Sequence, residues 1–327
     1  ISAFKTIDNT RPFPIQNMFA KQINTPQGWL AFELNVLRRL KFNSAILPFT
    51  SDPHLGAYLK RWNVRVSAND LMQSAWTKAV AAIENNHEKL SDDEVNVILE
   101  DAYVPYHRLQ NTALRRWFNE TDAWWFDNVR RNIENLVSPV AKAIASSLAM
   151  SVGDYVMSFT EETSELRQPL STVYKRLQSI LPEPFDNNQN NACQNKPTNE
   201  FIAENHFDLM FLRLPPAHNQ NGRNRFGTAV WREEWIRGND DFWVDLEQSN
   251  ADRLGALIET KRQYLRLIEE TLRTASHIPT WAIAHVEDGF ISTQDVVETI
   301  GHVRRVDTIF TKDFSELTGA KAVIITA

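Results

Sequence analysis

Residue types on which many functional sites depend are scarce in this chain of 327 residues. Its one cysteine, Cys193, excludes a disulfide framework and a cysteine-based zinc site, and suits a reducing compartment. Glycine occurs only 10 times, less than half of its usual share of about 7%, so glycine-rich nucleotide loops are scarce. No run approaches about 18 apolar residues, so we expect no membrane partner.

The chain also lacks an excess of basic residues, and its formal net charge is −6 at pH 7. A protein that holds nucleic acid alone usually carries a basic excess. The acidic balance therefore leaves DNA as a candidate partner and favours a protein partner. The opening residues, ISAFKTIDNT, have neither the apolar core nor the cleavage pattern of a signal peptide, so we expect a cytoplasmic protein.

The pattern of apolar residues predicts an α/β protein interrupted by helices. Apolar strands are predicted at 44–49 and 63–68 with a helix at 54–62 between them, which indicates a parallel sheet. The α/β pattern returns near the C-terminus, with helices at 251–276 and 292–301 and strands at 206–212, 281–286, 303–310 and 322–326. We expect an N-terminal α/β part at 1–72, a helical insertion at 73–182, and a C-terminal α/β part at 183–327.

The insertion is helical in pattern almost throughout. Ser91-Asp-Asp-Glu94 fits a capping box that opens a helix. An aromatic cluster at helical spacing is predicted to be core: Trp117, Phe118, Trp124, Trp125 and Phe126. Residues 182–199, rich in Asn and Pro, are predicted to form a surface loop.

Ligands of open α/β sheets bind outside the carboxyl ends of the strands, and two such ends carry distinctive turns. The first is Leu47-Pro-Phe-Thr-Ser-Asp-Pro53, with Asp70 after the next strand; the second is Leu214-Pro-Pro-Ala217. Each turn also has an ordinary interpretation. Ser51-Asp52-Pro53 fits a helix-capping turn, and Leu214–Ala217 fits a turn that ends a strand.

These turns belong to four segments that, in this order, resemble the Dam-like (D12-class) adenine-N6 DNA methyltransferases: 46–71, 118–136, 207–219 and 281–306. The resemblance implies a Rossmann-like SAM-dependent methyltransferase fold with a helical insertion for target recognition. In that family a Pro-Phe-x-Gly-x-Gly loop holds S-adenosylmethionine (SAM), and an Asp-Pro-Pro-Tyr turn holds the flipped adenine.

The cofactor positions depart from the family pattern. The resemblance places Phe49, Ser51, Pro53 and Asp70 at the SAM site, with Ser51 and Pro53 where the family has glycines. Glycine allows close backbone approach at positive φ, whereas serine adds a Cβ and proline removes an N–H donor. Asp70 keeps the ability to accept hydrogen bonds from a ribose. We therefore expect no cofactor, or SAM if the chain is nevertheless active.

The catalytic positions, Leu214, Pro215, Pro216 and Ala217, depart as well. In the family, the aspartate and the first proline carbonyl accept hydrogen bonds from the adenine amine, and the tyrosine stacks on the base. Leu214 in place of the aspartate has no acceptor, and Ala217 in place of the tyrosine has no stacking face. A shift of one residue would put Arg213 at the aspartate position.

The residues around and after this turn are polar, in a stretch that faces DNA in the family. Candidate phosphate contacts are Arg213, Asn219, Arg223 and Arg225. The ordinary interpretation is that these side chains are solvated.

Three hypotheses follow. The first is a catalytically impaired homologue, a pseudo-methyltransferase, that acts as a DNA-binding or scaffolding subunit in a restriction-modification type of system. The second is an active adenine-N6 DNA methyltransferase with an atypical motif. The third is a different α/β enzyme that uses His285, Glu287 and Asp70 at the strand ends. The histidines are isolated in sequence, so we expect no metal site.

Overall fold

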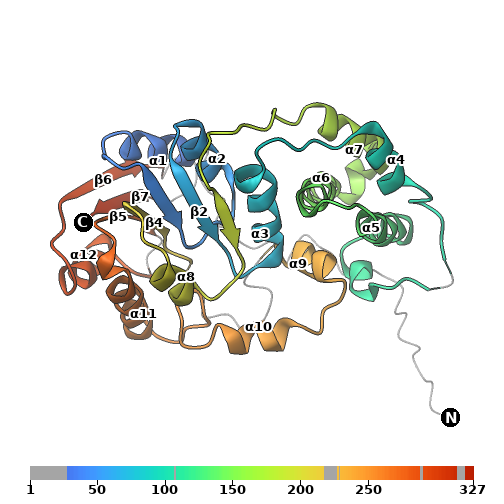
Figure 1. Ribbon diagram of the computed structural model, residues 1–327. Coiled ribbons are helices and arrows are strands. Elements are labelled where there is room, and N and C mark those ends of the chain that lie inside the picture. Colours follow the sequence, from blue (N-terminus) through green and yellow to red (C-terminus); the bar gives the residue numbers. More distant parts are fainter. Residues whose placement is uncertain (1–27, 107, 217–226, 228, 288–289, 315–320) are drawn as a thin grey trace, which may run out of the picture.

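The computed structural model describes residues 28–106, 108–216, 227, 229–287, 290–314 and 321–327. It has a mixed α/β fold built on a seven-stranded, mostly parallel sheet with the order β3-β2-β1-β4-β5-β7-β6 (Figure 1). Only β7 runs against its neighbours β5 and β6. The strands are β1 (Ser44–Leu47), β2 (Arg65–Asn69), β3 (Ala192–Gln194), β4 (Leu209–Arg213), β5 (Thr280–Glu287), β6 (Thr308–Asp313) and β7 (Lys321–Thr326).

The first strand–helix–strand unit forms as its apolar pattern predicts. β1 and β2 are parallel, with Ser44 opposite Arg65, and α2 (His54–Arg61) connects them. β1 pairs on its other side with β4, so the strand order reverses between β1 and β4. A reversal of this kind opens a crevice at the carboxyl ends of the two strands, which is where such folds bind ligands.

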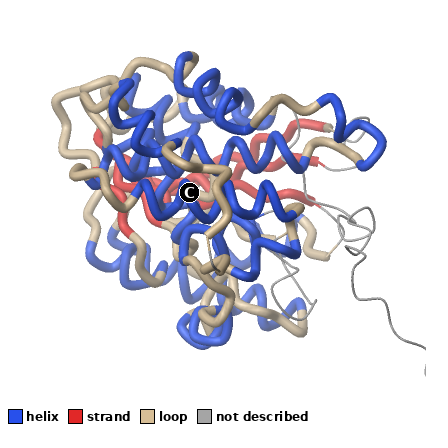
Figure 2. Tube along the Cα trace, turned by 90° about the vertical axis from the view of Figure 1, so that its right-hand side faces the viewer, coloured by secondary structure: helices blue, strands red, loops and turns tan. Residues whose placement is uncertain are grey.

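Helices cover both faces of the sheet (Figure 2). α1 (Trp29–Leu37) and α2 share one apolar core with the strands, and α8 (Thr198–Glu204), α11 (Lys261–Thr274) and α12 (Thr293–Gly301) share the other. Two buried faces explain why the central strands are continuous apolar runs rather than alternating ones. None of the described helices combines the length and the apolar character that crossing a bilayer requires.

The insertion is a helical bundle beside the sheet, with a core of its own. The Ser91 side chain caps α4 in a capping box with Glu94, as predicted. Of the predicted aromatic cluster, Trp117 is partly buried and the other four side chains are buried. The bundle consists of α3 (Gln73–Ala79), a π-helical turn (Val80–Glu84), α4 (Asp92–Leu99), α5 (Glu120–Ile133), α6 (Pro139–Met157), α7 (Leu170–Ser179) and two short 3-10 turns (Thr112–Arg116 and Glu161–Leu166).

One helix from the C-terminal part joins this bundle. α9 (Ala229–Arg237) inserts Trp231 and Trp235 into the helical core, and both side chains are fully buried. A Cβ on Gly153 of α6 would lie 2.1 Å from the Trp231 ring, so only glycine lets the two helices approach this closely. The core of the bundle is therefore completed by α9, a helix that follows β4 in sequence and is distant from both α5 and α6.

Two local predictions were wrong, and two helices were not predicted. The helix predicted over 251–276 is α11 alone, because Thr260 caps it and Gly255 with φ +93° turns the chain before it. The predicted loop 182–199 contains β3. No element was predicted between the strand at 206–212 and the helix at 251–276, where the structure has α9 and α10 (Trp243–Ser249). β3 forms in a polar sequence because β2 offers it an edge, with Ser67 opposite Ala192.

Candidate functional site

The β1–α2 loop lies at the carboxyl end of β1, where the sequence places a cofactor loop. Ser51 adopts φ +41°, the left-handed conformation that favours glycine. Its backbone N–H donates to Asp70 Oδ2 at 2.8 Å. Thr50 donates through both its backbone N–H and its hydroxyl to the Asn69 carbonyl, each at 3.0 Å. The loop thus keeps a glycine-like backbone and is bonded to the end of β2.

Asp70 is the centre of these contacts. Its other oxygen, Oδ1, accepts from the Met72 backbone N–H at 2.9 Å, and the residue is 7% exposed. Burial raises the pKa of Asp70 to about 6, and the nearby charge of Glu233 also acts to raise this pKa. The backbone N–H groups of Ser51 and Met72 act in the opposite direction, because they stabilise the anion. Asp70 therefore joins two backbone segments, and both of its oxygens are already engaged by the protein.

Phe49 packs against the apolar core, and Pro53 begins a helix. Phe49 is partly buried against the apolar core that contains α11. A Cβ at Gly255 would lie 3.4 Å from the Phe49 ring, so the chain before α11 lies against this side chain. Pro53, with φ −79°, is the N-cap residue of α2. These contacts agree with the ordinary interpretation of Ser51-Asp52-Pro53 as a capping turn.

The turn after β4 is likewise bonded to its surroundings. The Leu214 N–H donates to the Ala284 carbonyl at 2.9 Å, and its side chain packs against the apolar core. The Pro215 carbonyl accepts a hydrogen bond of 2.5 Å from the Tyr264 hydroxyl of α11. Pro216 is exposed, and Ala217 lies outside the described residues. The carbonyl that the resemblance assigns to adenine recognition is thus occupied by a tyrosine that is itself buried.

Arg213, the last residue of β4, forms a bidentate ion pair. Its Nε and NH2 groups donate to the two carboxylate oxygens of Glu33 at 2.7 Å each, and Glu33 is fully buried. Burial disfavours the charged guanidinium, but the Glu33 carboxylate outweighs it and raises the pKa of Arg213. The third guanidinium group, NH1, faces the Thr50 carbonyl at 3.5 Å. Arg213 therefore connects α1 to the β1–α2 loop.

The other three candidate DNA contacts, Asn219, Arg223 and Arg225, lie outside the described residues. Their role and that of Arg213 in contacting nucleic acid stay predictions.

Sequence reasoning missed the contact between Asp52 and His54 and the burial of Lys78, all titratable residues near the loop. Asp52 Oδ1 accepts from the His54 backbone N–H at 2.9 Å and contacts the His54 ring Nδ1; this contact raises the pKa of His54. Lys78 on α3 has a pKa lowered to about 8, because burial and the charge of Arg232 disfavour its ammonium. The Asp-x-His spacing at a helix start was a readable signal, whereas the burial of Lys78 was not.

The sheet does not bring together the residues of the third hypothesis. His285 is 3% exposed within β5, and Glu287 accepts the Thr293 backbone N–H at 3.0 Å. β5 is separated from β2, which leads into Asp70, by β1 and β4, so these strands are about 14 Å apart. Within the described part of the chain, no cluster of His, Cys, Asp and Glu side chains could hold a metal ion.

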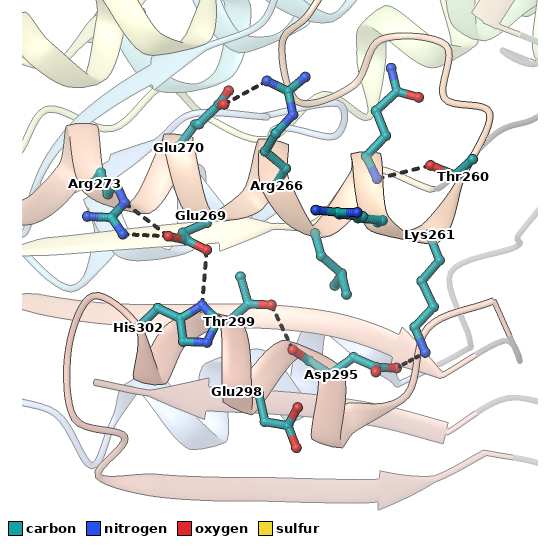
Figure 3. Close-up of a pocket in the computed structure, with 13 residues that line it drawn as sticks. Thr260, Lys261, Arg266, Glu269, Glu270, Arg273, Asp295, Glu298, Thr299 and His302 are labelled. Carbon is teal, nitrogen blue, oxygen red and sulfur yellow. Dashed lines mark hydrogen bonds and ion pairs between the residues drawn. The ribbon is translucent and has the colours of Figure 1, made fainter.

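The surface hollows among described residues include two that the strand-end turns do not line. The larger, of about 1030 Å³, lies between α11 and α12 (Figure 3). Its charged side chains largely pair with one another: Arg266 with Glu270 at 2.8 Å, and Lys261 with Asp295 at 2.7 Å. A hollow whose charges already compensate each other offers little to attract a charged ligand.

Comparison with known proteins leaves the family unassigned. No protein-family model matches this chain, and no curated protein matches its sequence.

Proposed function

We propose that this protein is a catalytically impaired homologue of the adenine-N6 DNA methyltransferases that acts as a DNA-binding or scaffolding subunit. The carrying observation is that the protein itself occupies the polar groups expected to hold cofactor and base. Asp70 accepts the backbone N–H groups of Ser51 and Met72, and the Pro215 carbonyl accepts the Tyr264 hydroxyl. A ligand would have to share these already bonded oxygens, or displace the protein's own donors and leave them buried and unpaired at about 1–3 kcal/mol each.

The architecture supports the same proposal. A mostly parallel sheet that reverses order between β1 and β4, with β7 inserted antiparallel between β5 and β6, is the arrangement that a SAM-dependent methyltransferase fold implies. The helical insertion follows β2, as the resemblance implies for a target-recognition segment. Fold alone does not establish chemistry, so the proposal rests on the site.

The test is calorimetric titration of the protein with SAM, together with transfer of tritium from labelled SAM to mixed-sequence DNA. We expect no saturable heat and no label in DNA. Fluorescence anisotropy with a fluorophore-labelled duplex, in the absence of SAM, then measures DNA binding independently of the chemistry. The variant Tyr264→Phe frees the Pro215 carbonyl and should still transfer nothing, because Leu214 supplies no acceptor. Micromolar SAM affinity in the wild type would refute the proposal.

The second candidate, an active adenine-N6 methyltransferase that transfers the methyl group from SAM, is favoured by one observation. Ser51 already holds the positive φ that the family reserves for glycine, so the loop backbone needs no rearrangement to approach a ligand. If this candidate is correct, labelled methyl groups appear in DNA, and Asp70→Ala abolishes both the heat of SAM binding and the transfer.

A further inference from the structure

An ordered segment with exposed side chains lines the outer side of the helical insertion. Residues 98–104, from the end of α4 onward, run antiparallel to α5, because Asn132 contacts their beginning and Asn128 their end. The Asn132 side-chain amide donates to the carbonyls of Ile98 and Glu100 at 3.1 and 2.8 Å. The Asn128 amide donates, within 3.2 Å, to the carbonyls of Asp101, Ala102 and Val104.

These bonds fix a segment that has no regular structure after α4. Asn128 is 1% exposed, and a buried amide is tolerated only when its polar atoms are bonded. Further along, both oxygens of Asp127 accept backbone N–H groups, from Gln110 at 2.8 Å and from Asn111 at 3.1 Å. Side chains of α5 therefore hold residues 98–104 along their length, and Asp127 holds the chain again at Gln110 and Asn111.

Three side chains in and just after this segment are nevertheless exposed, although the Tyr103 hydroxyl also accepts the Ser171 backbone N–H at 3.3 Å. Tyr103, Val104 and Tyr106 are between 39 and 47% exposed, and the Arg131 guanidinium lies 4.3 Å from the centre of the Tyr106 ring. Tyrosine and arginine are enriched where proteins contact one another. A rigid apolar loop loses little conformational entropy on binding, which makes it an efficient contact surface.

Acidic side chains precede these aromatic groups in the chain. On α4, Asp93, Val97 and Glu100 are exposed and share one face, at spacings of four and three residues, and Asp101 follows directly. None of these three acids forms an ion pair with another residue in the part of the chain that the structure describes. Their charges are therefore unpaired, while Arg131 places a positive charge over the Tyr106 ring.

We propose that this face is a docking surface for a basic, amphipathic segment of a partner protein. The α4 surface consists of Asp93, Val97, Glu100, Tyr103, Val104 and Tyr106. Its acids attract lysine or arginine, and its tyrosines and valines contact the apolar side chains between them. The same acids repel a nucleic acid backbone. The inference goes beyond the proposed function, since it requires neither SAM nor DNA to bind.

The probe is a short amphipathic peptide of lysine and leucine, compared with a counterpart of glutamate and leucine. Binding to the full chain is measured by calorimetry, and the contact is located by hydrogen exchange. We expect the lysine peptide to bind, to protect residues 93–106, and to weaken as salt is raised. Tyr106→Ser and Glu100→Lys should each reduce affinity about tenfold.

Two matched substitutions control for net charge and for loss of an exposed tyrosine. Tyr58→Ser removes a tyrosine of α2 that is 44% exposed, against 47% for Tyr106. Asp245→Lys reverses an exposed acid on α10. Both should bind the lysine peptide as the wild type does. Absence of binding, equal loss in the controls, protection elsewhere in the chain, or preference for the glutamate peptide would each overturn the proposal. So would loss of DNA binding caused by Glu100→Lys.

Discussion

The buried carboxyl of Asp70 predicts an unusual dependence of stability on pH. Its pKa is about 6 in the folded protein, against an ordinary value of 3.8. The folded state therefore binds this proton more tightly than the unfolded state does. Its contribution to stability is fully present below about pH 4, and is lost as the pH rises through 6. A difference of about two units corresponds to about 3 kcal/mol.

The variant Asp70→Asn removes this titration. The amide oxygen can still accept from Ser51 or Met72, but its NH2 group faces the other donor, so the variant has an offset that does not vary with pH. The free energy of unfolding of the wild type minus that of the variant should fall by about 3 kcal/mol between about pH 4 and 7. Urea denaturation at a series of pH values measures both, and other titrating groups cancel in the difference.

Asp208 provides a matched control directly before β4, at the amino end of that strand. It also accepts two backbone N–H groups, from Asn43 at 2.8 Å and from Ser44 at 2.9 Å. The Asn43 bond is the main cause that lowers its pKa, because Asp208 is less buried than Asp70. For Asp208→Asn the same difference should rise with pH from the acid side. A difference for Asp70→Asn that stays constant from about pH 4 to 7 would refute the assignment of a buried, proton-binding carboxyl.

Three further predictions concern packing and backbone. Gly153→Ala should lower the free energy of unfolding by about 1–3 kcal/mol in urea denaturation, since the new Cβ meets the Trp231 ring; an unchanged midpoint would contradict that contact. Arg213→Met leaves Glu33 buried without its cationic partner and should lower the free energy of unfolding by about 3–5 kcal/mol. The double variant with Glu33→Met should recover much of this loss. Purely additive losses would argue against the ion pair. Ser51→Gly should alter stability by less than about 1 kcal/mol while Ser51→Val costs more, because φ is positive there; equal effects in thermal denaturation would refute the strain.

Local sequence was sufficient for elements whose signals lie within a few residues. The predicted capping box at Ser91 forms, and Ser292 caps α12. The two serine hydroxyls accept the backbone N–H groups of Glu94 and Asp295 at 3.2 Å. The central strands β1, β4 and β5 were located because residues buried on both faces must be apolar whatever their neighbours are. The turn after β1 was also identified, because proline and polar residues directly follow the apolar run of that strand.

The tertiary structure alone decided which distant groups meet. The sequence could not show that Tyr264 reaches Pro215 or that Arg213 pairs with Glu33, because these partners are 49 and 180 residues apart. It also could not show β3, a strand that exists only through pairing with β2. Periodicity reports which side of an element is buried, but not against what. The candidate site depends on which groups pack against each residue. The Asp70 carboxyl could bind a ligand or, as in this structure, backbone N–H groups of its own chain.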